Sequence, residues 1–191
     1  MIHQKPSKIF RVVVYGSEST GKTTLCQDLA AHYKTEWVPE FARSYLQNKW
    51  DQKKEFCSLD ELPLIAKGQM ELENQQITKA NKILFCDTNI LVTQIWSETH
   101  FDGYCDPLIK QAAEQVYYDL YLLTGIDVPW EKDDLRDRPN DRKKMFKYFH
   151  KNLIKRNLEY KRIKGSRENR IKSAQTAIDS IFLLNADSER L

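Results

Sequence analysis

Short runs of apolar residues alternate with longer amphipathic stretches along this chain of 191 residues. Two of the runs, residues 9–15 and 83–87, are apolar almost throughout. Such continuous apolarity is typical of parallel strands that are buried on both faces of a sheet. Together with three shorter runs they predict five strands, at residues 9–15, 35–38, 83–87, 117–123 and 160–163.

Helices are predicted between these strands, because apolar residues there recur every three or four positions. The predicted helices span residues 22–33, 40–46, 60–80, 88–98, 108–115, 140–156 and 167–181. In the third helix we expect Asp60 as the N-cap and Pro63 in the first turn, where a missing N–H loses no bond. Residues 48–58 are polar and are predicted to be irregular. The alternation indicates one doubly wound α/β domain, residues 1–191, with its core at about 9–181.

The most specific motif lies between the first predicted strand and the first predicted helix, where a phosphate-binding loop is expected. Its glycines allow a tight bend that turns backbone N–H groups toward an anion, and the helix adds its N-terminal donors. Lys22 would reach the β- and γ-phosphates of ATP, and the Thr23 hydroxyl would hold Mg²⁺. We expect the following residues to bind the nucleotide: Gly16, Ser17, Glu18, Ser19, Thr20, Gly21, Lys22, Thr23 and Thr24.

Two acidic residues follow strands and are candidates for the acceptor side of the site. Asp87 ends the strand at residues 83–87, where an acid helps to hold Mg²⁺ or touches an acceptor hydroxyl. Asp87 can equally be the cap of the next helix. Glu40 follows the second strand and is placed to accept a hydroxyl proton, while Arg43 binds a phosphate or pairs with Glu40. Glu40 and Arg43 can also belong to the start of an ordinary surface helix. The sequence does not choose between Glu40 and Asp87 as the general base.

A segment dense in charged residues and prolines follows the fourth predicted strand and has the position of a lid. It carries Arg136, Arg138 and Arg142 within seven residues. Arginines there would neutralise the charge of a transferring phosphoryl group and help to exclude water. The interleaved aspartates also permit a loop whose charges pair with one another. We place the lid at about residues 130–145.

Aromatic residues near the predicted site are candidates to stack on a flat base. They are Trp37, Trp96, Tyr45 and Tyr104, although an aromatic at helical spacing more often belongs to the core. Trp96 lies about two helical turns after Asp87 and is the most attractive of them. After the fifth strand, the residues around Arg167 have the position at which small kinases hold adenine.

Composition excludes several classes of protein. The net charge of +3 gives no argument for a nucleic-acid partner. The four cysteines lack the spacing of a zinc site, which suits a reducing cytoplasm. The N-terminus has no signal-peptide pattern, and no apolar run is long enough to span a membrane. We therefore expect a cytoplasmic protein with a small-molecule partner; the sequence does not indicate an oligomeric state.

Five segments follow one another along the chain in this order: GSESTGKTTL, PEFARSYL, DTNILVTQIW, PWEKDDLRDRP and GSRENRIKSA. In this combination it resembles the ribosylnicotinamide kinase domain of NadR-type proteins. The resemblance runs from about residue 9 to residue 177. The first segment is common to many unrelated NTPases, whereas the patterns PW…D.LR and DT….T..W are far more discriminating.

The resemblance implies the P-loop fold of nucleoside and nucleoside-monophosphate kinases. That fold is a three-layer α/β/α arrangement with a five-stranded parallel sheet of order 2-3-1-4-5 and a lid. The implied reaction is the phosphorylation of the 5′-hydroxyl of nicotinamide riboside by ATP and Mg²⁺, giving nicotinamide mononucleotide. It also implies roles for matching residues. Lys22, Asp87, Glu40, Arg136, Arg138 and Arg142 would act in transfer; Glu40, Arg43, Asp87, Asn89 and Trp96 would contact the nucleoside; Arg167 would join the ATP site; and Thr23 and Asp87 would hold the metal.

Two departures from the family limit what carries over. Some family members have repressor and adenylyltransferase domains ahead of the kinase; this chain begins eight residues before its first strand, so we expect neither activity. Some relatives also have an aromatic residue immediately before the acid matched by Glu40, and here that residue is Pro39. Trp37 or Trp96 would then supply the stacking surface, or the base differs. A kinase of another nucleoside or deoxynucleoside, and a regulatory P-loop ATPase, remain the alternatives.

Overall fold

The computed structural model describes residues 2–136 and 138–188, with side chains described as far as residue 182. Five strands form one parallel sheet in the order β2-β3-β1-β4-β5. The strands are β1 (Phe10–Tyr15), β2 (Trp37–Val38), β3 (Ile83–Asp87), β4 (Leu120–Thr124) and β5 (Tyr160–Ile163). The expected fold class and strand order are confirmed.

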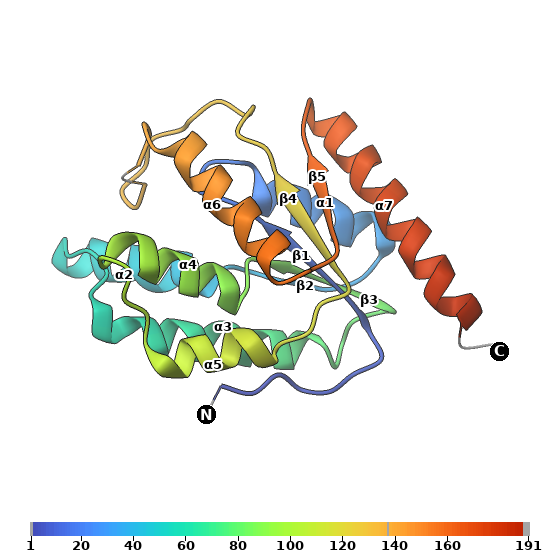
Figure 1. The fold of residues 1–191 in the computed structure, drawn as a ribbon, viewed down its shortest axis with the longest axis horizontal. Helices are drawn as coiled ribbons and strands as arrows, with labels where there is room; N and C mark the ends of the chain where they lie inside the picture. Colours follow the sequence, from blue (N-terminus) through green and yellow to red (C-terminus); the bar gives the residue numbers. More distant parts are fainter. Residues whose placement is uncertain (1, 137, 189–191) are drawn as a thin grey trace.

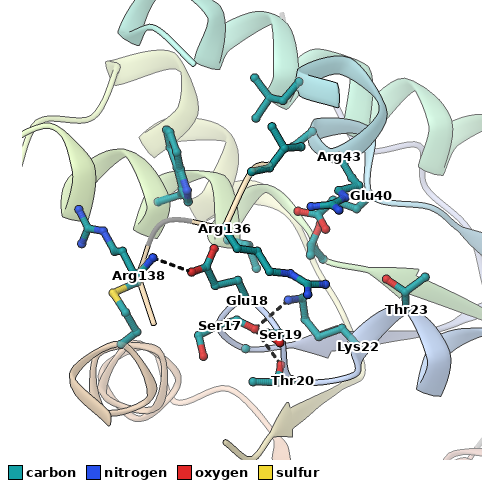
Figure 2. A pocket seen from close by; sticks show the side chains of 18 of the residues that line it. Ser17, Glu18, Ser19, Thr20, Lys22, Thr23, Glu40, Arg43, Arg136 and Arg138 are labelled. Atoms are coloured by element: carbon teal, nitrogen blue, oxygen red, sulfur yellow. Dashed lines mark hydrogen bonds between the residues drawn. The ribbon is translucent and has the colours of Figure 1, made fainter. Parts of the chain in front are cut away.

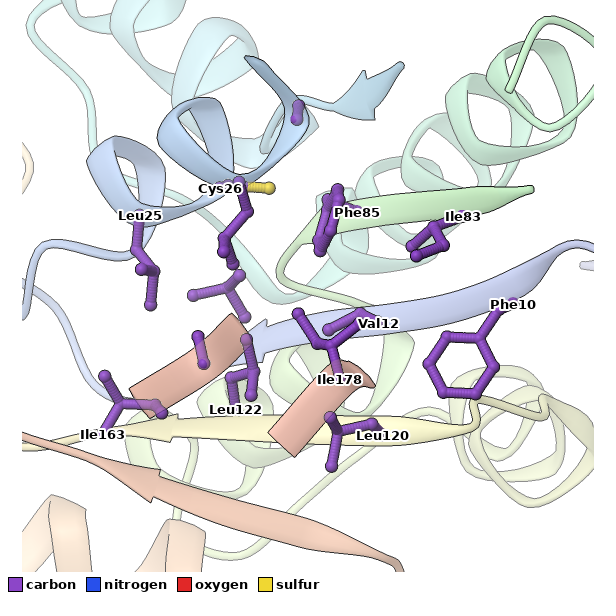
Figure 3. Close-up of a cluster of buried hydrophobic side chains, with 14 residues drawn as sticks. Phe10, Val12, Leu25, Cys26, Ile83, Phe85, Leu120, Leu122, Ile163 and Ile178 are labelled. Carbon is purple, nitrogen blue, oxygen red and sulfur yellow. The ribbon is translucent and has the colours of Figure 1, made fainter. Parts of the chain in front are cut away.

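Helices cover both faces of the sheet (Figure 1). They are α1 (Lys22–Tyr33), α2 (Phe41–Lys53), α3 (Leu62–Gln76), α4 (Ile90–His100), α5 (Pro107–Gln115), α6 (Arg142–Lys155) and α7 (Arg167–Ser188), with a 3₁₀ turn at Leu59–Glu61. On one face, α1 and α7 pack on alternate residues of the central strands, such as Val12, Val14 and Phe85 (Figure 3). Each of these three side chains is fully buried.

The opposite face is covered by α4 and α6, whose Ile95 and Phe149 pack against Val13, Tyr15 and Leu123. A smaller cluster lies farther out and joins α3, α4 and α5. Partly buried aromatic and aliphatic residues of α2 pack on this cluster rather than on the sheet. The position of α2 therefore depends on α3.

The register of the central strands places the candidate site residues at one edge of the sheet. Val14 on β1 pairs with Asp87 on β3, and Tyr15 pairs with Leu123 on β4. The loop after β1 and the carboxylate that ends β3 therefore lie side by side at the carboxyl edge of the sheet, where ligands bind in open parallel sheets.

Two predictions between residues 46 and 62 differ from the structure, although residues 54–58 are irregular, as predicted. The segment predicted as irregular continues α2 to Lys53, where polar side chains four residues apart bond to each other: Gln47 to Asp51 at 3.0 Å and Gln52 to Asn48 at 3.0 Å. Asp60 is not the N-cap of α3: it lies in the 3₁₀ turn, which Ser58 caps in a reciprocal capping box with Glu61, and Glu61 is the N-cap of α3. Pro63 lies in the first turn of α3, as expected.

Other element ends also differ from the predictions. The helix after β3 begins at Ile90, and its cap is Asn89, whose Oδ1 accepts from the Val92 N–H at 3.3 Å. The alternative that Asp87 caps this helix is therefore wrong. Helix α3 ends at Gln76, not residue 80, and β4 begins at Leu120, not residue 117. Helix α6 begins at Arg142, whereas α7 continues to Ser188. Asp137, within the expected lid, lies outside the described residues, as do 189–191 in the C-terminal tail.

Candidate active site

The loop after β1 is held in a shape that requires small residues. Gly16 has φ 147°, and a Cβ there would overlap the Thr124 Oγ1 of β4. Gly21 is left-handed, with φ 75°, at the start of α1. Ser19 is also left-handed, with φ 52°. This backbone forms a loop whose N–H groups are available to an anion at the N-terminus of α1.

Side chains of the loop brace it from within. Thr20 Oγ1 donates to the Ser17 carbonyl at 2.8 Å, and the Thr20 and Thr124 hydroxyls are 2.8 Å apart. Lys22 Nζ donates to the same Ser17 carbonyl at 2.9 Å. This contact holds the ammonium over the loop, where it would meet the phosphates of a nucleotide.

Asp87 is buried beside the loop. It is 1% exposed, and its Oδ2 accepts from Thr23 Oγ1 at 2.5 Å. Burial raises the pKa of Asp87 to about 6; the negative charge of Glu40 adds to the rise, and Lys22 and the Thr23 hydrogen bond oppose it. The two candidate carboxylates are therefore close enough to influence each other.

The Thr23–Asp87 pair fits a magnesium ion. Asp87 Oδ1 is buried and has no hydrogen-bond partner among the described residues. A hydroxyl and a carboxylate oxygen are hard ligands of the kind that Mg²⁺ takes in nucleotide sites, alongside phosphate oxygens. Within the part of the chain that the structure describes, no group of three or more His, Cys, Asp or Glu residues is placed to hold a metal without such a ligand.

A cavity of about 370 Å³ joins the phosphate loop to the acceptor candidates. Lys22, Thr23, Glu40, Arg43, Arg136 and Arg138 all line it, and in Figure 2 the Arg138 side chain extends away from the phosphate loop. Trp96 also lines it, and the His100 ring covers one face of Trp96, with ring centroids 4.0 Å apart and planes at 16°. Beyond Glu40 the wall is apolar and contains Leu46, Leu62 and Ile65.

The arginines of the expected lid have different surroundings. Arg136 lines the cavity, and its Nε lies 3.0 Å from Asp133. The same Asp133 accepts two hydrogen bonds from Arg43 of α2, at 3.1 and 2.6 Å. Arg138 donates to the Thr99 carbonyl at 2.8 Å. The segment is thus fastened to α2 and α4 by its own charged side chains.

Arg142 is turned away from the cavity. Its guanidinium donates to the carbonyls of Ser19 at 3.0 Å and Val128 at 2.8 Å, and it lies 5.9 Å from the centroid of the Trp130 ring. It therefore supports the phosphate loop from outside, which differs from the transfer role that we expected.

A second cavity of about 530 Å³ lies on the other side of the phosphate loop, between the loops after β4 and β5. Arg167 lines it, as expected, with its guanidinium bonded to Asp28 at 2.6 and 2.8 Å. Arg170 is buried at its base and donates to the carbonyls of Thr20 at 2.8 Å and Gly125 at 3.2 Å. Arg170 also contacts Asp127 Oδ1 at 2.7 Å.

The structure separates three other candidates from the first cavity, the one beside Lys22 and Glu40. Asn89 is buried; besides capping α4, its Nδ2 donates to the Tyr121 hydroxyl at 3.2 Å, so it does not line the cavity. Trp37 packs on the α1–α7 side of the sheet. Tyr45 stacks on Phe41 and donates to Glu61. Of the candidate aromatics, only Trp96 lines the cavity among the described residues.

Sequence reasoning missed two polar residues of the site. Arg170 lies within the segment GSRENR that was noted only for Arg167, one helical turn later. Gln69 of α3 lines the first cavity. Nothing in its sequence neighbourhood marks it, because its partners lie about thirty residues away in the chain, at Pro39 and Phe41.

Comparison with known proteins identifies the family of the chain. Residues 11–170 match a family model described as an AAA domain. The trifunctional NAD biosynthesis/regulator proteins NadR of Escherichia coli K12 and Salmonella typhimurium LT2 are both 27% identical to the chain, over 161 and 162 residues. These matches cover 83% and 84% of the chain but 39% of each relative, so the chain spans about two-fifths of their length.

Solved structures show the same fold. A NadR protein in complex with NR matches 92% of the chain and 52% of its own length, with a TM-score of 0.78 and 20% identity. Thymidylate kinase from Ehrlichia chaffeensis matches 93% of the chain and its whole length, with a TM-score of 0.54 and 17% identity. The expected resemblance to NadR-type proteins is confirmed. Among the described helices, none has the length and apolarity needed to cross a membrane.

Proposed function

The chain belongs to the AAA domain family, and on that premise we propose that it transfers the γ-phosphoryl group of ATP to the 5′-hydroxyl of nicotinamide riboside. One observation carries the proposal: a single cavity contains both Lys22 and Thr23 of the phosphate loop and Glu40, Arg43 and Trp96 opposite them. A site that only binds or hydrolyses a nucleotide does not need room for a second molecule lined by a carboxylate, a cation and an aromatic ring.

The donor lies across the two cavities in this proposal. The triphosphate binds the N–H groups of residues 16–24 and Lys22, and the adenine occupies the second cavity near Arg167, behind Arg170 and Asp127. Thr23 and Asp87 would hold Mg²⁺, which neutralises phosphate charge when it is bound. Burial and the Thr23 bond suit Asp87 for that role.

Glu40 is the proposed proton acceptor for the nucleoside hydroxyl. It lines the cavity, whereas Asp87 is 1% exposed and already engaged by Thr23. A general base must lie within hydrogen-bond reach of the proton that it takes, which favours the carboxylate on the cavity wall. Trp96, backed by His100, offers a flat surface for the base of the nucleoside.

Residues 130–145 act as the lid of this single kinase unit in our proposal. Arg136 and Arg138 line the cavity and bring positive charge to it. Positive charge held there stabilises the transferring phosphoryl group more in the transition state than in the ground state. The bonds of Asp133 to Arg43 and of Arg138 to Thr99 hold the lid over the site, which excludes water from the reaction.

Three of the similar proteins support the choice of acceptor. The NadR relatives are named for NAD biosynthesis, and the NadR structure of TM-score 0.78 was solved with NR bound. A kinase of another nucleoside is the second candidate. The apolar wall formed by Leu46, Leu62 and Ile65 favours it, because such a wall selects a ring by shape rather than by hydrogen bonds.

The test is a nucleoside panel with Mg-ATP, in which ADP release and the phosphorylated product are both measured. We expect ADP release that depends on nicotinamide riboside and is matched by nicotinamide mononucleotide. Turnover with a different nucleoside would show that the protein is a kinase whose acceptor is not nicotinamide riboside. Equal ADP release with and without every nucleoside would contradict both kinase candidates and leave a regulatory ATPase.

A further inference from the structure

Helix α3 lies against the short segment that carries Glu40, and two consecutive residues make the contact. Gly68 has no side chain, and a Cβ there would overlap the ring carbons of Phe41. The neighbouring Gln69 is 3% exposed and lines the cavity. The close approach at Gly68 brings the Gln69 side chain to the backbone of the segment.

The Gln69 carboxamide bonds to the peptide groups on both sides of Glu40. Its Oε1 accepts from the Phe41 N–H at 2.8 Å, and its Nε2 donates to the Pro39 carbonyl at 3.3 Å. A carboxamide is suited to this task because its oxygen accepts and its NH₂ group, bonded to the same carbon, donates. The backbone at Glu40 is therefore fixed from both ends by one side chain of another helix.

Glu40 is the N-cap residue of α2, with φ −68° and ψ 107°. A polar N-cap side chain usually bonds a backbone N–H of the first helical turn. Within the residues that the structure describes, the Glu40 side chain makes no such bond, and the Phe41 N–H is taken by Gln69. One of the orphan donors at the start of α2 is thus satisfied from outside the helix, and the Glu40 carboxylate remains directed at the cavity (Figure 2).

We propose that Gln69 is a positioning residue, an external cap of α2 that holds the Glu40 carboxylate at the acceptor hydroxyl. The capping geometry stands by itself, whereas its effect on catalysis rests on the proposed function. Displacement of a reacting group by about 1 Å can reduce turnover a hundredfold, so a fixed backbone at Glu40 matters for the rate. Gln69 touches neither substrate in this proposal and acts through Glu40.

The first arm of the test needs no substrate. Amide hydrogen exchange at Phe41 is compared in the wild-type protein and in Gln69→Leu, Gln69→Glu and Gln75→Leu. Gln69→Leu removes both bonds, and we expect Phe41 to exchange at least about tenfold faster. Gln69→Glu keeps the acceptor, so it should stay within about threefold of wild type. Gln75→Leu, the same change at an exposed position of α3, is the matched control.

The second arm is a double-mutant cycle with Glu40→Gln, measured as kcat and KM for nucleoside and for ATP. We expect Gln69→Leu alone to lower kcat at least about tenfold while KM for ATP changes less than twofold. In the Glu40→Gln background the same change should cost less than about twofold, because the group that it positions is already lost. Gln69→Glu should recover most of kcat.

Each outcome decides between the two claims. Unchanged exchange at Phe41 in Gln69→Leu would overturn the external cap. Faster exchange with fully additive losses in the cycle would overturn the positioning role, and it would leave Gln69 as a structural residue only. A wild-type protein without phosphotransfer would contradict the proposed function and with it the catalytic role of Gln69, whereas the exchange arm would still decide whether the cap exists.

Discussion

The two ends of the first cavity, which Lys22 and Glu40 both line, are built in different ways. The donor end is one continuous loop, residues 16–24, whose shape depends on its own backbone and on left-handed conformations at Ser19 and Gly21. The acceptor end gathers side chains from α2, α3, α4 and the segment before α6. The donor residues therefore come from one segment, which Thr124, Arg142 and Arg170 brace, whereas the acceptor residues meet only after distant helices have packed.

The two carboxylates express the same difference. Asp87 is buried at the end of a central strand and bonded to Thr23 of the loop. Glu40 stands at the start of α2, on the cavity wall, and its backbone is held by Gln69 of α3. In the proposed reaction, two similar side chains would therefore serve different partners: Asp87 would serve the nucleotide and its metal, and Glu40 would serve the acceptor.

The largest expected effect is at the donor end. Lys22→Ala removes the cation that the Ser17 carbonyl holds over the loop. We expect kcat/KM for ATP to fall about 10³-fold, the scale of lost charge stabilisation in a phosphoryl-transfer site. Lys67→Ala, at an exposed position of α3, is the control for a lost lysine. A loss below about tenfold in Lys22→Ala would mean that the loop does not bind the transferred phosphate.

Asp87→Asn separates catalysis from stability. We expect kcat to fall about 10²-fold, because a carboxylate that would hold the metal is replaced by a neutral amide. The same variant should be more stable than wild type in the ligand-free form at pH 8. Burial raises the pKa of Asp87 from 3.8 to about 6 in the folded state, so the fold loses stability as pH rises between these two values, and the loss is complete above them.

The stability difference is measured by chemical denaturation at two pH values. At pH 8 the Asp87→Asn gain should be about 1–3 kcal/mol, corresponding to a pKa rise of about two units. Near pH 4 the folded wild type already binds this proton, so the difference should nearly vanish. An equal gain at both pH values would show that the charge of Asp87 is not the cause.

At the second cavity, Arg170→Met should act on ATP and leave the acceptor alone. Arg170 ties the phosphate loop to the loop after β4 through Thr20 and Gly125. We expect KM for ATP to rise about tenfold with KM for the nucleoside within twofold. Arg170→Lys keeps the charge and tests whether misfolding causes the rise in KM for ATP. Lys172→Met, on the same helix, is the control for the change to Met. Equal increases in both KM values would remove the distinction between the two ends.

The smallest expected effect concerns the lid. Asp133→Asn weakens the bonds to Arg43 and Arg136, which are partly exposed to solvent. Pairs of this kind contribute at most about 1 kcal/mol, so kcat should fall two- to fivefold and more steeply at low salt. Asp134→Asn changes a neighbouring, exposed acid whose partner is the neutral Gln47. Equal effects in the two variants would show that the pairing is unimportant.

What could be predicted from the sequence follows the same division. The phosphate loop could be predicted because eight consecutive residues define its motif, and Asp87 could be predicted because it ends an apolar strand. The predicted helix was shorter than α2 because the second half of α2 is stabilised by polar pairs such as Gln47–Asp51, which show no apolar periodicity in the sequence. Gln69 could not be predicted because its contacts, the Phe41 N–H and the Pro39 carbonyl, come near it only in the folded chain.

The central claim, that donor and acceptor functions occupy separate ends of one cavity, is tested most directly by Glu40→Gln. The measurement is nicotinamide-riboside-dependent ADP release together with the Kd for ATP. We predict that kcat falls about 10²-fold while the Kd for ATP stays within twofold, because the change removes only the proton acceptor. An unchanged kcat, or a Kd for ATP that rises as much as kcat falls, would contradict the claim.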